Sequence, residues 1–489
     1  MKMIQATLQK DVYKEFHVHA YHPDVKKVYS NYTNRSSKLS NIKDSKGVVF
    51  LGLQYFIKEY LIKTWNETFF KVSKDVAMKN HKELLSNMLG HDVNVDYLSN
   101  LYDLGYLPLK IKALPEGTLV PYQVPCFTIV NTVEGFQWLT NMVETVLSSY
   151  IWAISTSATT AKAYYDKFME YSQKTCDNDD HVKFQGHDFS FRGMFGLEAA
   201  AMSGFAHLCS GFVGTDTIPA VRFAEDYYNA DSSKELIGCS VNATEHSVTC
   251  SWQNEGEIEF FKYLMNEVSP VGVLSIVSDT WDFWKVVNEF LPQLKKDIMA
   301  RDGKVVIRPD SGDPVDIICG KSPLREMPED KGLIECLWDI FGGTINSKGY
   351  KVLNDKIGAI YGDSITLERQ EQILDKLERK GFASSNIVLG IGSYTYQYVT
   401  RDTHGTAVKA TAVYKNNKWE AIYKDPKTDN GKKSLKGLLK VYRSGDNIKV
   451  NDNCTVKEES EGLLEVVYEN GKLVQETSLR QIRDIADEI

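Results

Sequence analysis

The sequence lacks the features that mark three large classes of protein. No apolar run approaches the roughly 18 residues that a membrane-spanning helix needs. The eight cysteines form no CxxC pair and no spacing typical of a zinc site. The net charge is −8, so the chain has no broad basic surface for nucleic acid. We therefore expect no membrane partner, no nucleic-acid partner, and reduced thiols in a cytoplasmic protein.

The beginning of the chain lacks an apolar segment as well. The first 14 residues mix Lys, Gln and Asp, so we expect no secretory signal there. What the chain does contain is typical of a soluble globular protein: 489 residues, of which 43% are hydrophobic and 25% charged. That length favours two domains.

From about residue 236 onward, apolar strand-like runs alternate with helix-like segments. We predict strands at 236–241, 272–277, 304–307, 357–361 and 386–389, and helices at 257–268, 281–299 and 367–380. This alternation favours a parallel sheet or barrel in an α/β protein. Polar residues follow the predicted strands at 242–247, 278–280, 308–313, 362–364 and 390–393. Because the carboxyl ends of parallel strands meet on one face, we expect an active site there.

The two ends of the chain have the pattern of β-hairpins instead. Residues 436–476 contain LLKVYR-SGDN-IKV and LLEVVY-ENGK-LVQ, the second with an Asn470-Gly471 turn. Residues 28–32 and 118–130 are also strand-like. We therefore predict an irregular (β/α) barrel over residues 151–409. We predict a second, β-rich domain that residues 1–150 and 410–489 build together.

The most informative strand end follows the buried run 304–307. Arg308 can bind a phosphate through its forked guanidinium, and Asp310 can hold a sugar hydroxyl or a metal-bound water. At another strand end His246, beside Glu245, is a candidate nucleophile or acid–base, although a lone histidine is more often structural. The sequence GIGS, which ends at Ser393, can place backbone N–H groups around a phosphate.

Two further segments allow a structural and a functional interpretation. HDFSFRG, at residues 187–193, is either a half-buried strand or a flat-ring platform in which Phe189 stacks on a ligand and Arg192 binds an anion. GTDT, at residues 214–217, is a turn by composition. Its Asp216 either serves the turn alone or accepts a hydrogen bond from a ligand amide.

The ordered set of these motifs resembles a known family. HDFSFRG, GTDT, ATEHS, SIVSD, IRPDSGDP, YGDS and TRD occur in the order typical of the nicotinamide phosphoribosyltransferases, which are type II phosphoribosyltransferases. The resemblance covers essentially the whole chain. It implies a homodimer with shared active sites that joins nicotinamide to 5-phosphoribosyl 1-pyrophosphate in NAD salvage. It also implies an irregular α/β barrel beside a β-rich domain.

The resemblance implies a role for each matching residue. For nicotinamide, Phe189 stacks on one face of the ring, Tyr13 of the partner subunit covers the other, Asp216 accepts from the carboxamide, and Arg308 lies beside them. The residues that match the ribose and phosphate ligands are Arg308, Asp310, Gly362, Asp363, Gly392, Ser393, Arg401 and Lys409. Those that match the pyrophosphate ligands are Arg192, His246, Arg308, Arg35 and Lys424.

The resemblance also implies Mg²⁺, with ATP as a co-substrate. Asp279 matches a contact to Mg²⁺ through water. Arginines and Mg²⁺ would stabilise the departing pyrophosphate, while Asp310 stabilises the positive charge on the ribose. ATP would phosphorylate His246, with Glu245 orienting the imidazole.

Three positions depart from the family pattern. Ser393 replaces a glycine of the phosphate loop, so its Cβ must fit where φ could be positive. Ala407 stands where the family has a serine that binds phosphate, and Gly358 replaces an arginine near the tunnel that leads to the ring site. We expect these changes to alter affinity rather than the reaction.

Three other functions are compatible with the fold. The first is nicotinate phosphoribosyl transfer, although Asp216 would repel the acid. The second is an aldolase or isomerase acting on phosphosugars, but the predicted strand ends carry no lysine for a Schiff base. The third is a non-catalytic binding or signalling protein, against which Arg308, Asp310, His246 and Arg401 are all retained.

Overall fold

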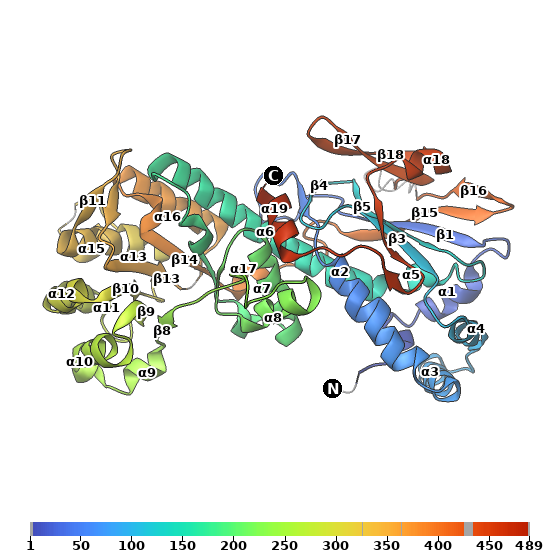
Figure 1. The fold of residues 1–489 in the computed structure, drawn as a ribbon, viewed down its shortest axis with the longest axis horizontal. Coiled ribbons are helices and arrows are strands. Elements are labelled where there is room, and N and C mark those ends of the chain that lie inside the picture. The colour runs from blue at the N-terminus through green and yellow to red at the C-terminus, as the bar shows by residue number, and fades with distance from the viewer. Residues whose placement is uncertain (1–2, 325, 363, 425–433, 488–489) are drawn as a thin grey trace. The chain divides into compact units, whose positions relative to one another are not determined.

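The computed structural model describes residues 3–324, 326–362, 364–424 and 434–487. The chain divides into two units. Unit 1 comprises Met1–Thr159, Ala224–Ala230 and Val399–Ile489, and unit 2 comprises Thr160–Phe223 and Asp231–Tyr398. Figure 1 labels the helices and strands of both units.

Unit 2 is built on a parallel sheet of seven strands in the order β7-β6-β14-β13-β10-β9-β8. The strands are β6 (Gly186–Asp188), β7 (Gly214–Thr215), β8 (Asn242–Ala243), β9 (Val271–Val277), β10 (Asp302–Arg308), β13 (Ile357–Tyr361) and β14 (Ile387–Ile391). A parallel bridge between Gly214 and Cys239 links β7 to the segment that leads into β8. The predicted α/β class with a parallel sheet is confirmed.

The register of these strands explains the core of unit 2. Val305 of β10 pairs with Leu274 of β9 and with Ile357 of β13, so the three side chains share one face of the sheet. All three are buried against helices that follow the strands along the chain. The helices of unit 2 include α7 (Leu197–Cys209), α9 (His246–Cys250), α10 (Glu257–Tyr263), α12 (Leu291–Ala300), α13 (Pro314–Cys319), α15 (Leu333–Phe341), α16 (Leu367–Arg379) and α17 (Ser393–Gln397).

Most of the predicted elements occur within a few residues of their expected positions. The strand predicted at 357–361 has the bounds of β13, and the helix predicted at 367–380 is α16. The helix predicted at 281–299 is divided into α11 (Phe283–Lys285), a π-helical turn (Val286–Phe290) and α12. The prediction of a strand at 236–241 is wrong. Within this range only Cys239 forms an isolated β-bridge. The residues that pair with β9 as a strand are Asn242 and Ala243, which form β8.

Unit 1 contains an antiparallel sheet of seven strands in the order β16-β15-β1-β5-β3-β19-β20. The strands are β1 (Lys27–Thr33), β3 (Leu109–Ala113), β5 (Pro125–Asn131), β15 (Ala407–Lys415), β16 (Lys418–Ala421), β19 (Glu465–Glu469) and β20 (Lys472–Leu473). The predicted hairpins are confirmed. One is β17 (Leu438–Ser444) with β18 (Asn447–Cys454), and the other is β19 with β20, whose turn holds Asn470 and Gly471 at positive φ.

Unit 1 also has a helical part that was not predicted from the sequence. It includes α1 (Lys14–Ala20), α2 (Leu53–Tyr55), two π-helical segments (Phe56–Thr64 and Asn66–Phe70), α3 (Lys74–Leu89) and α4 (Asp96–Leu104). Phe56, Trp65 and Phe69 are buried with Leu98 and Ile129 in one apolar cluster. The helices therefore share a core with the sheet.

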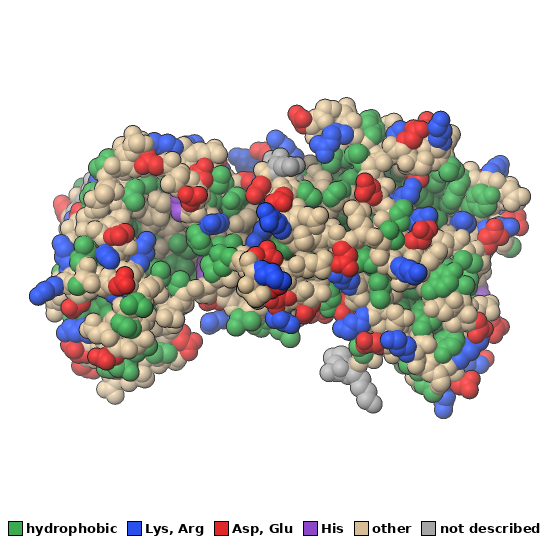
Figure 2. Space-filling view, in the orientation of Figure 1, with side chains coloured by type: hydrophobic (Ala, Val, Ile, Leu, Met, Phe, Trp, Pro, Cys, Tyr) green, Lys and Arg blue, Asp and Glu red, His purple; other side chains and the backbone are tan. Residues whose placement is uncertain are grey.

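The surface carries charges of both signs. Lys and Arg side chains are interspersed with Asp and Glu on the face that Figure 2 shows. Among the described residues, no helix is long and apolar enough to cross a membrane.

Candidate functional site

The carboxyl ends of the parallel strands carry most of the predicted site residues of unit 2. Arg308 ends β10, and the residues that follow the other strands are Phe189 after β6, Asp216 after β7, Asp279 after β9, Gly362 after β13 and Gly392 after β14. Since every strand pair in this sheet is parallel, these ends lie on one edge. Asp363 lies outside the described residues.

Arg308 and Asp310 form a forked ion pair at the end of β10. Nη2 of Arg308 donates to Oδ2 of Asp310 over 2.9 Å, and Nε lies 3.2 Å from both carboxylate oxygens. The guanidinium carbon lies 5.7 Å from the centre of the Phe189 ring. The ion pair holds the cation at a defined height over the aromatic face.

Two glycines provide the space for these side chains. A Cβ on Gly362 would lie 2.3 Å from Oδ1 of Asp310, and a Cβ on Gly390 would lie 2.7 Å from Cδ2 of Phe189. Neither glycine has a positive φ, so close approach rather than backbone conformation requires them.

Asp279 links β9 to the loop that follows β10. Its Oδ2 accepts from the backbone N–H of Asp310 over 2.9 Å and from the Ser311 hydroxyl over 2.5 Å. Its other oxygen, Oδ1, is buried and has no hydrogen-bond partner among the described residues. Nε2 of His246 lies 3.7 Å from this Oδ1. Asp279 thus has one saturated oxygen and one that faces the imidazole.

The imidazole of His246 is half exposed at the first turn of α9. Its Nδ1 lies 3.1 Å from the Thr280 hydroxyl, so both ring nitrogens face the end of β9. Glu245 is the residue before the helix, and its carboxylate accepts from the Ser247 hydroxyl. The side chains that orient the imidazole in this structure are therefore Thr280 and Asp279.

Asp216 has a defined set of donors. Its Oδ1 lies 2.9 Å from Nε2 of His187 and accepts from the Ser240 hydroxyl over 2.5 Å. Burial raises the pKa of Asp216, but the bonds from His187 and Ser240 outweigh it and hold the pKa below its usual range. Among the described residues, Oδ2 receives no side-chain donor, so an ionised oxygen remains for a ligand. The His187 ring also lies 4.5 Å from that of Phe189.

Four side chains at this edge had no individual role predicted from the sequence: His187, Ser240, Thr280 and Ser311. His187 could have been found, because it lies two residues before Phe189 and its side chain therefore points to the same face of the strand. Ser240 has no such signal, since it reaches Asp216 from a segment 24 residues away.

Ser393 fits the site without backbone strain. It begins α17 and is absent from the residues with positive φ, so the expected conflict does not arise in this structure. A Cβ on Gly193 would lie 2.0 Å from the Ser393 hydroxyl, so the serine fills the space above that glycine. Arg192, the neighbour of Gly193, is exposed in a short 3-10 turn (Phe191–Gly193).

Gly358 lies beside a lysine stem. A Cβ on Gly358 would lie 3.3 Å from Cδ of Lys304, which is on the neighbouring strand β10. Burial lowers the pKa of Lys304, and Asp355 opposes this effect. The side chain of Lys304 therefore occupies part of the space beside Gly358, the position at which an arginine is typical of the family.

Unit 1 carries four of the cations predicted to bind phosphate, and three of them act electrostatically on the fourth, Lys409. Burial lowers the pKa of Lys409, and the positive charges of Arg35, Lys424 and Arg401 lower it further, against an opposing effect of Glu144. Arg35 is oriented by donating from Nε to the Gly405 carbonyl over 2.6 Å. Like charges gathered in this way are typical of an anion site. Ala407, two residues before Lys409 on β15, adds no hydroxyl to it.

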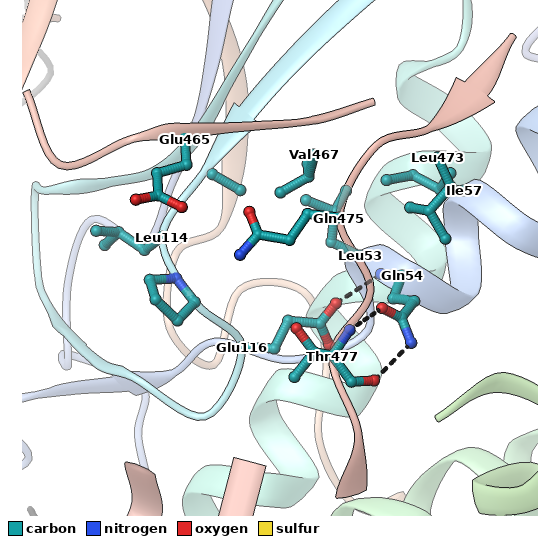
Figure 3. A pocket seen from close by; sticks show the side chains of 12 residues that line it. Leu53, Gln54, Ile57, Leu114, Glu116, Glu465, Val467, Leu473, Gln475 and Thr477 are labelled. Atoms are coloured by element: carbon teal, nitrogen blue, oxygen red, sulfur yellow. Dashed lines mark hydrogen bonds between the residues drawn. The ribbon is translucent and has the colours of Figure 1, made fainter. Parts of the chain in front are cut away.

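A small cavity in unit 1 has a structural explanation. Its volume is about 50 Å³, and Figure 3 shows the residues that line it, none of which is a predicted site residue. Glu116 in its wall accepts from the backbone N–H groups of Gly52 and Gln54 and from the Tyr228 hydroxyl. The Gln54 amide in turn exchanges hydrogen bonds with the backbone of Thr477. These polar groups satisfy one another.

A parallel α/β sheet whose carboxyl edge carries an arginine, carboxylates and an aromatic ring is typical of enzymes that bind phosphorylated sugars. Known proteins agree with this class. The sequence profile of the nicotinate phosphoribosyltransferase family matches residues 184–472. A nicotinamide phosphoribosyltransferase of Acinetobacter baylyi is 50% identical over 97% of this chain and 95% of its own. One of Mycoplasma pneumoniae is 41% identical over 71% of this chain and 76% of its own.

Solved structures with low sequence identity show the same fold. Human nicotinic acid phosphoribosyltransferase superposes with a TM-score of 0.59 at 13% identity, over 98% of this chain and 93% of that one. Nicotinate-nucleotide pyrophosphorylase of Pyrococcus furiosus has a TM-score of 0.58 at 17% identity, over 99% and 95%. The chain belongs to the nicotinate phosphoribosyltransferase family.

Proposed function

We propose that this protein transfers the phosphoribosyl group of 5-phosphoribosyl 1-pyrophosphate to nicotinamide, which gives nicotinamide mononucleotide and pyrophosphate for NAD biosynthesis. The observation that carries the proposal is the ionised Asp216 carboxylate near the ring of Phe189, with Oδ2 left to accept from a carboxamide. The relatives described above, which carry the nicotinamide name, support the choice of substrate.

The reaction needs positioning and charge stabilisation more than proton transfer. The bond between C1 of the ribose and the pyrophosphate oxygen breaks, and the lone pair of the pyridine nitrogen forms the new C1–N bond. That nitrogen carries no proton, so no base is required. Arg308 stabilises the departing negative charge, and Asp310 stabilises the cationic ribose. The ion pair of these two residues uses Nε and Nη2, which leaves Nη1 for a phosphate oxygen.

Mg²⁺ fits the donors around Asp279. The buried Oδ1 of Asp279 lacks a hydrogen-bond partner among the described residues, which a hydrated cation would supply. Within those residues no group of three or more His, Cys, Asp or Glu forms a cage, in keeping with an ion that is bound largely by water and substrate phosphate. When bound, Mg²⁺ would neutralise charge on the pyrophosphate.

ATP stimulation through His246 is part of the proposal. The imidazole is half exposed, and a ring nitrogen can take the γ-phosphoryl group of ATP, with release of ADP. We expect His246→Ala to lose stimulation by ATP and to keep some basal turnover, because Arg308 and Phe189 remain. Turnover measured with and without ATP checks this, with Ser251→Ala on the turn after α9 as a control. Undiminished stimulation would contradict the phosphohistidine.

A homodimer with shared sites completes the proposal. Tyr13 is 58% exposed on unit 1, where its ring can cover nicotinamide on Phe189 of the partner subunit. Exposed aromatic side chains on unit 2, Phe195, Tyr394 and Tyr398, offer further apolar surface for a second copy.

We further infer a division into two domains whose boundaries lie close to those of the two units, although unit 1 also includes Ala224–Ala230 and the residues from Val399 onward. Residues 151–409 form the catalytic α/β domain, and residues 1–150 with 410–489 form one β-rich domain. The division of the chain and the antiparallel sheet, which holds strands from both ends, support this inference.

The test is a direct assay. The purified chain is incubated with 5-phosphoribosyl 1-pyrophosphate and Mg²⁺, with either nicotinamide or nicotinate, and with or without ATP. We expect nicotinamide mononucleotide from nicotinamide and much less product from nicotinate. No mononucleotide in any tube would refute the proposal. A preference for nicotinate would favour the alternative substrate. Chelation of Mg²⁺ should abolish turnover.

A further inference from the structure

The segment that carries Tyr13 has an inverted pattern of burial. Tyr13 and Phe16 are 58% and 71% exposed, whereas the charged residues between them, Lys14 and Glu15, are only 4% and 3% exposed. Aromatic residues are normally buried, and Lys and Glu are almost never fully buried unless they are paired. The buried charged side chains of Lys14 and Glu15 therefore attach the segment to the rest of unit 1, and the aromatic rings of Tyr13 and Phe16 are exposed.

Glu15 is the centre of a buried network. It forms an ion pair with Lys10 over 2.5 Å, and its Oε2 lies 3.1 Å from Nε2 of His81 on α3. The Tyr97 hydroxyl of α4 donates to the same carboxylate over 2.7 Å. Nδ1 of His81 lies 2.9 Å from the Thr7 hydroxyl. We call Lys10, Glu15, His81 and Tyr97 the N-terminal anchor.

A second set of contacts fixes the other side of Tyr13. The Lys14 ammonium donates to the Asn141 carbonyl and to the Glu144 carboxylate, each over 2.8 Å. The Thr145 hydroxyl donates to Asp11 over 2.7 Å. Tyr13 thus lies between two attachment points, one on α3 and α4 and the other at residues 141–145.

The anchor has a geometric consequence in addition to any contribution to stability. Buried ion pairs cost desolvation, and apolar residues of similar volume are often at least as stabilising. What a buried, hydrogen-bonded ion pair adds is a single defined geometry. The His17 ring meets that of Tyr13 edge-on at 5.2 Å and the Lys14 ammonium lies 5.7 Å from the centre of the Tyr13 ring, yet Tyr13 remains 58% exposed.

We propose that the N-terminal anchor is a positioning device that holds the ring of Tyr13 at the height and angle needed to cover nicotinamide in the partner's site. The inference rests on the proposed function. Lys10, Glu15, His81 and Tyr97 are positioning residues that act through Tyr13 without touching the substrate.

The experiment measures steady-state kinetics of the full-length protein for both substrates. Glu15→Gln and Tyr97→Phe loosen the anchor, the second without removing a charge. Both should raise the KM for nicotinamide by about five- to tenfold, since misplacing a contact group weakens binding sharply. The kcat and the KM for 5-phosphoribosyl 1-pyrophosphate should change less than about twofold. Glu83→Gln, an exposed residue on the helix that carries His81, is the matched control and should change none of them.

A double-mutant cycle separates positioning from a structural role. In a Tyr13→Ala background, the anchor variants should have no further effect on the KM for nicotinamide, because the ring they position is gone. Effects that add to that of Tyr13→Ala, or a loss of thermal stability without a change in KM, would overturn the inference. If Glu15→Gln does not fold, Tyr97→Phe decides the question. A wild-type protein without nicotinamide-dependent turnover would instead refute the proposed function.

Discussion

At the scale of single residues, three carboxylates of one sheet edge have three different environments. Asp216 is held ionised by His187 and Ser240, Asp279 has one saturated and one unpartnered oxygen, and Asp310 is paired with Arg308. The same functional group can therefore bind an amide, a hydrated cation or a positively charged sugar.

The Asp216 environment predicts the basis of substrate choice. Asp216→Asn should lower kcat/KM for nicotinamide by about 10- to 100-fold, because a hydrogen bond to a charged group is worth about 1.5–3 kcal/mol. The same change removes the charge that repels nicotinate, so the preference for the amide should fall. Kinetics with both acceptors measure it, and Asp226→Asn serves as a control on a carboxylate outside the site. An unchanged preference would argue against the role of Asp216.

At the scale of elements, the buried carboxylate of Glu116 fixes the start of α2, which has no capping side chain. Gly52, before α2, has a φ of +101° and no capping side chain of its own. Glu116 supplies the missing acceptor from a distant part of the chain, since it binds the N–H groups of Gly52 and Gln54. Burial raises the pKa of Glu116, and these donors oppose that effect.

Replacing Glu116 tests this distant cap. Glu116→Gln keeps the size of the side chain but turns one acceptor oxygen into an amide that faces donors. We expect the free energy of unfolding to fall by about 1–3 kcal/mol, the cost of leaving a buried polar group unsatisfied. Urea unfolding measures it. Glu465→Gln, in the wall of the same cavity but exposed, should have little effect.

The N-terminal anchor predicts a pH dependence of stability. Burial opposes ionisation of Glu15, but His81 and Lys10 hold its pKa at about 2, below the usual 4.5. A carboxylate with a lowered folded pKa stabilises fully above about pH 4.5, and the stabilisation is lost as the pH falls toward 2. Because one pKa unit corresponds to about 1.4 kcal/mol, the upper limit of this contribution is about 3.5 kcal/mol.

Comparison with Glu15→Gln isolates this contribution from other acids. The difference in unfolding free energy between the wild type and Glu15→Gln should be larger at pH 6 than at pH 3. Urea titrations at both values measure it. An equal difference at the two values would mean that Glu15 is not ionised in the fold.

At the scale of the whole molecule, the proposed site needs two copies of the chain. The aromatic side chains of Tyr13 and Phe16 are exposed, and the residues between them, Lys14 and Glu15, are buried and hydrogen-bonded. An exposed aromatic ring on a backbone segment that is fixed in place can bind a partner with less loss of entropy than one on a free segment.

Shared sites predict complementation between inactive variants. At a nicotinamide concentration well below the raised KM of Tyr13→Ala, Tyr13→Ala and Arg308→Ala should each have little activity alone. When the two are mixed and their subunits exchange, half of the dimers pair one of each and contain one intact site of two, so activity should return to about a quarter of the wild-type value. Turnover before and after exchange measures the recovery. No recovery despite mixed dimers would place Tyr13 outside the partner's site.

Much of the fold could be predicted from the sequence, because the spacing of apolar residues within a segment indicates whether that segment forms a strand or a helix. The strand β13, the helix α16 and both C-terminal hairpins follow from patterns within a few residues. The strand predicted at 236–241 failed because pairing partners, rather than apolar character alone, decide where a short strand forms. The helices between residues 53 and 104 were left unassigned, and two helical segments there are π-helical, which disturbs the regular spacing.

The sequence by itself determined which types of side chain follow each parallel strand, because strands and loops alternate along the chain and the residues of each loop can be read directly. Only the tertiary structure decided how those side chains meet. It paired His246 with Thr280 and Asp279, gave Asp216 its donors in His187 and Ser240, and set Glu15 against His81 and Tyr97. The physical reason is that these contacts join residues dozens of positions apart, whose distances depend on the register and packing of whole elements.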